Sequence, residues 1–209
     1  LTALTVQNTR GVHGIHAVPE AFITQQIDVV LSDLGADAVK TGMLHSPAVI
    51  ETVVAALAQT DAPLVVDPVM RAKGGAALLH PEAQAALTEL LLPRATVLTP
   101  NVPEAEALTG LPVTSVAEAE RAAEAFLSQG VGSAVITLGE NGVFYKDATQ
   151  SAHVPAFHAG PVVETTGAGD AFNGGFATAL AEGQAPVDAV RFGCATAAIS
   201  VTRAGTAPS

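Results

Sequence analysis

The chain has 209 residues, of which 49% are hydrophobic and only 4% aromatic, and its mean hydropathy is +0.40. Twenty acidic against nine basic residues give a formal net charge of −11, which disfavours binding to nucleic acid or to an anionic membrane. No apolar run approaches the ~20 residues of a membrane span, no signal peptide is visible, and a single cysteine argues against a disulfide framework. We therefore expect a soluble, cytoplasmic protein.

Strand-like and helix-like stretches alternate along the chain. Strands are expected, in chain order, at residues 1–6, 36–40, 64–66, 96–98, 134–138, 143–146 and 152–154, with a further β-type stretch at 161–164. Helices are expected at residues 19–34, 47–58, 81–92, 103–108, 116–129, 171–181 and 187–201. This order predicts one α/β domain over 1–209, with a mostly parallel sheet between two helical layers. The turn Gly-Glu-Asn-Gly at 139–142 predicts an antiparallel hairpin at the sheet edge.

Polar residues and glycines follow most of the expected strands. Bound ligands in open α/β sheets lie at the carboxyl ends of the strands. The sequence therefore predicts one shared site, to which these strand ends contribute Gln7, Thr41, Gly42, Asp67, Asn101, Leu138, Gly139 and the segment 167–170.

The most informative motif is the run ETTGAGDAFNGGF at residues 164–176. The backbone N–H groups of Gly167, Ala168 and Gly169, at a strand-to-helix turn, can converge on an anion, and the helix N-terminus adds positive partial charge. A carboxylate beside a bound phosphate would repel it, but Asp170 is well suited to take a proton from a hydroxyl while a phosphoryl group is transferred. The alternative is a plain helix N-cap with Asp170 as the capping residue.

Two further carboxylates are candidate metal ligands. Glu104 follows Asn101 by three residues at a helix start, where the pair could hold Mg²⁺ and phosphates or could form a capping box without any ligand. Asp67 ends an apolar strand before Pro68 and is either a second metal ligand or a turn-forming residue.

Three other features have both a functional and a structural interpretation. The turn that contains Thr137, Gly139 and Gly142 is either a nucleotide contact or a simple hairpin turn. The segment 71–75 (RAKGG) is either a cationic loop that closes over phosphates or a solvated loop. Cys194, in an alanine-rich helix, is either a core residue or packed near a nucleotide base.

These motifs resemble two branches of the ribokinase-like kinase family. The GAGD run resembles the carboxyl-terminal signature of that family, although Glu164 stands where the family usually has Asp. Residues 1 to about 110 resemble the hydroxymethylpyrimidine/phosphomethylpyrimidine kinases of thiamine biosynthesis, through the strings TALTVQNT (2–9), GVHG (11–14), VKTGM (39–43), DPVM (67–70) and LTPN (98–101). The part from about 130 onwards looks more like ribokinase, through TTGAGD (165–170), RF (191–192) and AAISVTR (197–203).

The two resemblances differ at one important position, since the pyrimidine kinases usually carry Cys where this chain has Asp170. A natural mosaic and an engineered chimera are both compatible with the sequence. The pyrimidine kinases also have a glycine-rich strand-turn before the QNT string. Nothing here matches it, so the domain is expected to lack its first strand and helix.

The resemblance implies an ATP- and Mg²⁺-dependent kinase that acts on a hydroxymethyl-bearing heteroaromatic ring, either hydroxymethylpyrimidine, its phosphate, or a pyridoxine-like ring. It implies that Gln7 hydrogen-bonds the ring, that Met43 packs on it beside Gly42, and that Asp170 is the general base. It assigns Asn101, Glu104 and Asp67 to Mg²⁺ and phosphates, and Thr137, Gly139, Gly142 and Cys194 to the nucleotide. It also implies a K⁺ site at Glu164 and Thr166 and a homodimer. The alternatives are a ribokinase-type sugar kinase and a folded protein without kinase activity.

Overall fold

The computed structural model describes residues 1–8, 11–72 and 75–205. Its strands are β1 (Ala3–Asn8), β2 (Gly11–Ala17), β3 (Val39–Thr41), β4 (Leu64–Val66), β5 (Val97–Leu98), β6 (Ser133–Thr137), β7 (Val143–Asp147) and β8 (Ser151–Val154). Its α-helices are α1 (Glu20–Asp33), α2 (Pro47–Ala56), α3 (Ala83–Ala86), α4 (Val102–Thr109), α5 (Val116–Ser128), α6 (Ala168–Ala181) and α7 (Pro186–Ser200). Short 3₁₀ or π segments are η1 (Leu57–Gln59), η2 (Leu87–Leu91), η3 (Leu92–Arg94) and η4 (Gly139–Asn141).

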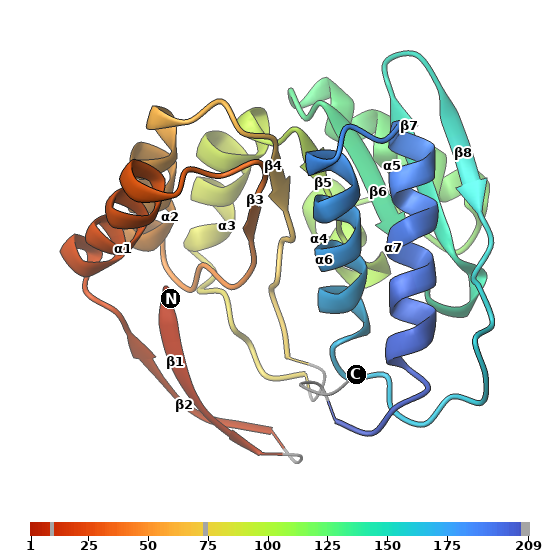
Figure 1. Ribbon diagram of the computed structural model, residues 1–209, viewed down its shortest axis with the longest axis horizontal. Coiled ribbons are helices and arrows are strands. Elements are labelled where there is room, and N and C mark those ends of the chain that lie inside the picture. The colour runs from red at the N-terminus through yellow and green to blue at the C-terminus, as the bar shows by residue number, and fades with distance from the viewer. Residues whose placement is uncertain (9–10, 73–74, 206–209) are drawn as a thin grey trace.

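Six strands form the central sheet, in the order β3-β4-β5-β6-β7-β8 (Figure 1). The strands from β3 to β6 pair in parallel, whereas β7 and β8 pair antiparallel at the edge. The expected α/β fold with a mostly parallel sheet and an edge hairpin is therefore confirmed.

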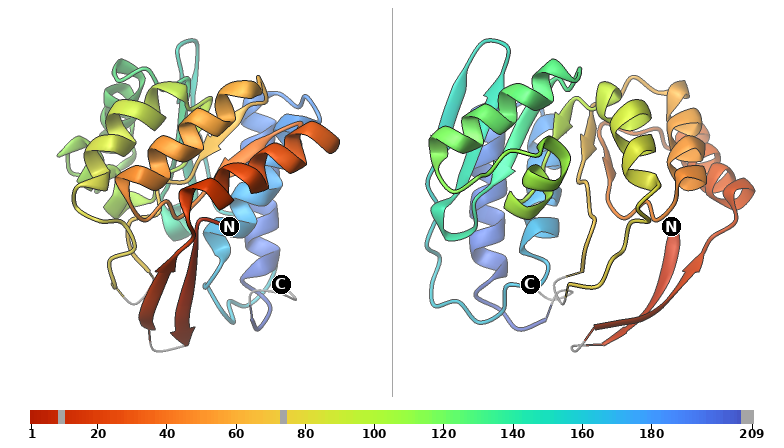
Figure 2. Two further views of the ribbon diagram at one scale, coloured as in Figure 1. Left: turned by 90° about the vertical axis from the view of Figure 1, so that its left-hand side faces the viewer. Right: turned by 180° about the vertical axis from the view of Figure 1, so that it is seen from behind.

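Helices cover both faces of this sheet, and two clusters of buried side chains fill the space between the layers. Alternate strand residues point to opposite faces, so Val65, Val97 and Val135 pack with α6 and α7, whereas Val66 and Leu98 pack with the helices from α1 to α5. Figure 2 shows α6 and α7 on one side and the earlier helices on the other. Burial on both faces explains why the parallel strands read as short continuous apolar runs.

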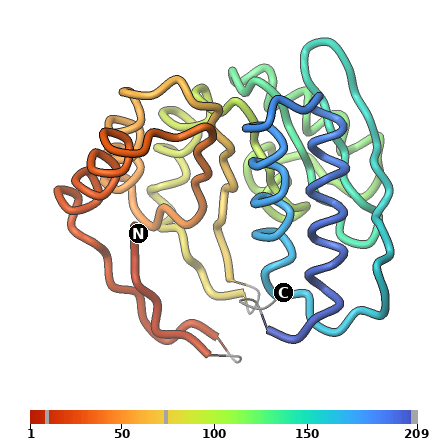
Figure 3. Tube along the Cα trace, viewed as in Figure 1, coloured from red at the N-terminus to blue at the C-terminus, as the bar shows by residue number. Residues whose placement is uncertain are grey.

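The amino-terminal part of the chain differs from the prediction. The first strand pairs with β2, which was not predicted, and the two form a separate antiparallel ribbon. In Figures 1 and 3 this ribbon projects away from the body of the molecule. The sequence of β2, with Gly11 and Gly14, has weak strand propensity, and its extended form depends on pairing with β1. The expectation that Gln7 follows a strand of the main sheet is wrong, because Gln7 lies within β1.

Two other segments depart from their predicted structure. The helix expected at 81–92 is divided into α3, η2 and η3, and Pro93, which has no N–H to donate, lies in the last of these segments. The stretch 161–164 is not a strand, since the N–H groups of Val163 and Glu164 both donate to Val201 O at the end of α7. Within the described ranges, no helix is both long and apolar enough to cross a membrane.

Candidate active site

The start of α6 provides the backbone of the candidate site. Gly167 is the N-cap, with a φ of 82°, and the helix begins at Ala168, three residues earlier than predicted. Asp170 therefore lies in the first turn, and the alternative that Asp170 is the capping residue is wrong. Among the described residues, no hydrogen-bond acceptor is found for the N–H groups of Gly169 and Asp170. Unpaired N–H groups at a helix N-terminus favour a bound anion.

A lysine joins two carboxylates at this helix end. Lys40 Nζ, from β3, lies 3.0 Å from Asp67 Oδ2 and 3.3 Å from Asp170 Oδ1. The Asp67 side chain is only 12% exposed, whereas that of Asp170 is 77% exposed. Burial would lower the pKa of Lys40, but the two carboxylates more than compensate and its pKa is raised. Burial also raises the pKa of Asp67, although the ammonium group opposes this effect.

A buried amide also holds Asp67 in place. Asn173 Nδ2, one turn after Asp170 on α6, donates to Asp67 Oδ2 at 3.2 Å and to Gly169 O at 3.1 Å. Its Oδ1 accepts a hydrogen bond of 2.8 Å from Thr99 Oγ1. Strand ends far apart in the sequence are thus linked to the first turn of α6.

Asn101 and Glu104 form the capping box that was the alternative to a metal site. The backbone N–H of Asn101 donates to Glu104 Oε2, and the N–H of Glu104 donates to Asn101 Oδ1, both at 3.0 Å. The Glu104 side chain is buried. Burial raises its pKa to about 7, hydrogen bonding by Asn101 opposes this rise, and the nearby charge of Asp67 adds to it. The charge of Asp67 therefore acts on the carboxyl group of Glu104.

The turn after β6 has the geometry of a hairpin connection. The N–H of Leu138 donates to Gly142 O, and Gly139 and Gly142 have φ values of 61° and 88°. A Cβ on Gly142 would lie 2.1 Å from Val154 O. Gly142 is therefore required by the fold, whether or not a nucleotide contacts this turn. Thr137 bridges to Asn101 in the neighbouring connection.

The structure brings only some of the predicted substrate and nucleotide residues to the Asp170 cluster. Gly42 adjoins it, because a Cβ there would lie 3.1 Å from Lys40 Nζ. Met43 O accepts a hydrogen bond from Thr2 Oγ1 at the base of the ribbon. Gln7 is exposed on β1, and in the described part of the chain no hydrogen bond or ion pair joins it to Asp170. Cys194 is buried in the core between α6 and α7, where burial raises its pKa to about 11.

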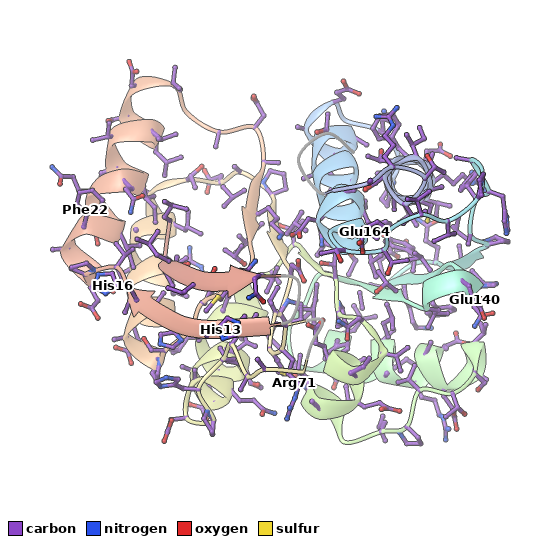
Figure 4. The ribbon with its side chains drawn as sticks, turned by 90° about the horizontal axis from the view of Figure 1, so that it is seen from below. His13, His16, Phe22, Arg71, Glu140 and Glu164 are labelled. Carbon is purple, nitrogen blue, oxygen red and sulfur yellow. The ribbon has the colours of Figure 1, made fainter. Side chains whose placement is uncertain are left out.

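The cationic segment is described in part. Arg71 Nη1 donates to Gly75 O at 3.3 Å, and Arg71 pairs with Ala77 in an isolated bridge. Figure 4, seen from below, labels Arg71 on the loop next to the ribbon and Glu164 near α6. Lys73 lies outside the described residues.

Sequence reasoning missed Lys40, Thr99 and Asn173 as members of the cluster. Lys40 and Thr99 are next to strand ends that were singled out, and Asn173 belongs to the GAGD run. All three residues belong to the sequence motifs described above, but only the fold reveals which side chains of a motif point into the site.

Comparison with known proteins gives a consistent result. The phosphomethylpyrimidine kinase family matches residues 1–204. This single match includes both the segment from 1 to about 110 and the segment from about 130 onwards, whose motifs resemble two different kinases. The chain is 48% identical over 140 residues to hydroxymethylpyrimidine/phosphomethylpyrimidine kinase of Bacillus subtilis, covering 66% of this chain and 52% of that protein. The chain thus spans about half the length of this relative.

Solved structures of two kinases have the same fold. Phosphomethylpyrimidine kinase from Clostridium difficile superposes with a TM-score of 0.80 at 31% identity, covering 93% of this chain and 82% of that one. Pyridoxal kinase from Staphylococcus aureus, in complex with AMP-PCP and pyridoxal, superposes with a TM-score of 0.78 at 27% identity, covering 99% and 78%.

Proposed function

The chain belongs to the phosphomethylpyrimidine kinase family, and on this premise we propose that it transfers a phosphoryl group from ATP to the hydroxymethyl group of a small heteroaromatic ring. The acceptor that we propose first is hydroxymethylpyrimidine or its phosphate, as in the names of its relatives. Pyridoxal is the second candidate, because a pyridoxal kinase bound to pyridoxal and an ATP analogue shares the fold over 99% of this chain.

The observation that carries the proposal is the position of Asp170. Its carboxylate lies in the first turn of α6, beside N–H groups without a partner among the described residues and within an ion-pair network that reaches Asp67. A mostly exposed carboxylate is accessible to an acceptor hydroxyl. The helix N-terminus favours the negative charge of a transferring phosphoryl group.

In the proposed mechanism Asp170 accepts the proton of the acceptor hydroxyl as its oxygen attacks the γ-phosphorus. The N–H groups of Gly167 and Gly169 stabilise charge on the transferred group, whereas that of Ala168, which the sequence also proposed, donates to Thr165 O at 3.3 Å. In comparable sites, loss of one such donor reduces the rate by about 10²–10³-fold. The Lys40 ammonium balances the carboxylates that surround the phosphates.

The residues present fit a bound Mg²⁺. Asp67 and Glu104 offer carboxylate oxygens, which Mg²⁺ prefers, and Mg²⁺ usually takes one or two protein carboxylates together with phosphates and water. After burial, the charge of Asp67 also raises the pKa of Glu104, and a divalent cation would relieve that repulsion. When bound, Mg²⁺ would neutralise phosphate charge. We assign Asn101 to the orientation of phosphates at the same place.

The remaining contacts of the proposal come from the family resemblance. Thr137, Gly139 and Gly142 would line the nucleotide, with Cys194 packed nearby. Gln7, Gly42 and Met43 would contact the ring. Glu164 would hold K⁺ with Thr166, whose N–H and Oγ1 donate to Glu164 Oε1 at 2.9 and 2.6 Å.

We further propose a homodimer. Large apolar side chains are exposed on the ribbon and on α1, including Val6 (68%) and Val29 (60%). Sedimentation velocity would detect the dimer, and a monomer at micromolar concentration would contradict it.

The deciding experiment measures ADP release from Mg²⁺·ATP with hydroxymethylpyrimidine, pyridoxal and ribose in parallel, for the wild type and for Asp170→Asn. We expect turnover with one heteroaromatic acceptor and a loss of at least about 10²-fold in kcat in the variant, with nearly unchanged ATP affinity. Asp61→Asn, at an exposed position, is the matched control. Turnover with ribose alone would establish a sugar kinase, and wild-type turnover in Asp170→Asn would remove Asp170 from the mechanism.

A further inference from the structure

We propose that Lys40 is a positioning residue that orients the Asp170 carboxylate for catalysis while Asp67 anchors its ammonium group. This inference rests on the proposed function, since it concerns the same reaction. It assigns a role to a side chain on the edge strand β3, 130 positions away in sequence from its partner Asp170.

Asp170 depends on Lys40 for its orientation. The Asp170 side chain is 77% exposed and makes no side-chain cap bond at the start of α6. Among the described residues, Lys40 is the group that hydrogen-bonds to its carboxylate, at 3.3 Å. An exposed carboxylate without this partner would sample several rotamers, and a base that is misplaced by 1 Å can lose about 10²-fold in rate.

Lys40 is itself held in place from several directions. Its Nζ lies closer to Asp67, at 3.0 Å, than to Asp170. Asp67 is in turn bonded to Asn173, whose position is fixed by the buried Thr99. Gly42 leaves room for the ammonium group, because a Cβ at that position would lie 3.1 Å from Nζ. The rigid side of the network is therefore Asp67, and the accessible side is Asp170.

A simple surface ion pair is the alternative explanation. Exposed pairs contribute about 0–1 kcal/mol to stability, and on this explanation the loss of Lys40 would leave kcat unchanged. The chain contains a matched example in Lys146 Nζ, which lies 2.9 Å from Glu120 and 3.3 Å from Glu124, away from the site. Lys146 also contacts two carboxylates, so Lys146→Met reports the effect of losing such a pair without a catalytic consequence.

The test is a double-mutant cycle in kcat with Lys40→Met, Asp170→Asn and the double variant, together with Lys146→Met. We expect Lys40→Met to lower kcat about 10-fold or more, with a change in acceptor KM below about 3-fold. Added to Asp170→Asn, the same substitution should change kcat by less than about 2-fold, because residues that act as a unit are not additive. Lys146→Met should retain wild-type kcat.

Each outcome decides the inference. The inference would be overturned if the Lys40→Met and Asp170→Asn substitutions lowered kcat independently, so that their effects multiplied in the double variant. An unchanged kcat in Lys40→Met would also overturn it. If Lys40→Met does not fold by circular dichroism, Lys40→Leu replaces it in the same cycle, because it also removes both the hydrogen-bond donor and the charge. A wild type without turnover on any acceptor refutes the proposed function itself, whereas wild-type turnover with a multiplicative cycle refutes only the role of Lys40.

Discussion

The buried carboxyl group of Glu104 should make the stability of the protein depend on pH. Its pKa rises from an ordinary 4.5 to about 7, mainly through burial. The folded chain binds the carboxyl proton of Glu104 more tightly than the unfolded chain does. The contribution of this proton to the unfolding free energy is therefore complete below pH 4.5 and is lost as the pH rises to about 7. Each pH unit in that window corresponds to about 1.4 kcal/mol, so the whole window corresponds to about 3 kcal/mol.

The substitution Glu104→Gln isolates this effect, since an amide oxygen can still accept the N–H of Asn101 that caps α4. Urea unfolding between pH 5 and pH 8, without metal or nucleotide, gives the unfolding free energy of both proteins. As the pH rises from 5 to 8, the unfolding free energy of the variant should increase by about 2–3 kcal/mol relative to that of the wild type. Glu51→Gln, at an exposed position on α2, is the control and should follow the wild type.

Parallel pH profiles for Glu104→Gln and the wild type would refute this reasoning. They would mean that Glu104 ionises in the folded chain as readily as in water. The electrostatic part of the proposed Mg²⁺ site would then have no support, because it depends on a carboxylate that burial and Asp67 make costly to ionise.

Two further predictions concern stability and thiol reactivity. Gly142→Ala should lower the unfolding free energy by at least about 2 kcal/mol in urea titrations, because the φ of Gly142 is positive and an added Cβ would overlap Val154 O. The control is Gly139→Ala, which also has a positive φ but open space around it, and which should lower the unfolding free energy by only about 1 kcal/mol. Equal losses in the two variants would contradict the argument. Cys194, whose pKa burial raises to about 11, should react with a thiol reagent at pH 8 only as fast as the protein opens, and rapid stoichiometric labelling of the native protein would contradict its burial.

The sequence was sufficient to predict those parts of the fold that depend on local patterns. Short apolar strands such as Leu64–Val66 indicated a parallel sheet buried on both faces, and the glycines at 139 and 142 indicated the edge hairpin. The ribbon strand β2 was missed because its extended conformation comes from pairing with β1 rather than from its own residues.

The candidate site shows the same division. Asp170 was predicted because the GAGD run is a compact local signal, and the capping box of Asn101 and Glu104 was visible as a spacing of three. The role of Lys40 was not visible, because its partners Asp67 and Asp170 are brought to it by two different elements. Contacts of this kind depend on the fold rather than on any one segment.

The β1–β2 ribbon has a consequence for hydrogen exchange. Two strands that pair only with each other are marginally stable in water. The bond from Thr2 Oγ1 to Met43 O joins this ribbon to the rest of the fold at its base, and the N–H of Val18, which donates to Thr2 O, closes the ribbon at the same end. Its backbone amides should therefore exchange with deuterium long before those of β4 and β6, through local opening that leaves the sheet intact. An acceptor that contacts Gln7 would slow the exchange of the ribbon alone, so a ligand could be detected there without any measurement of turnover.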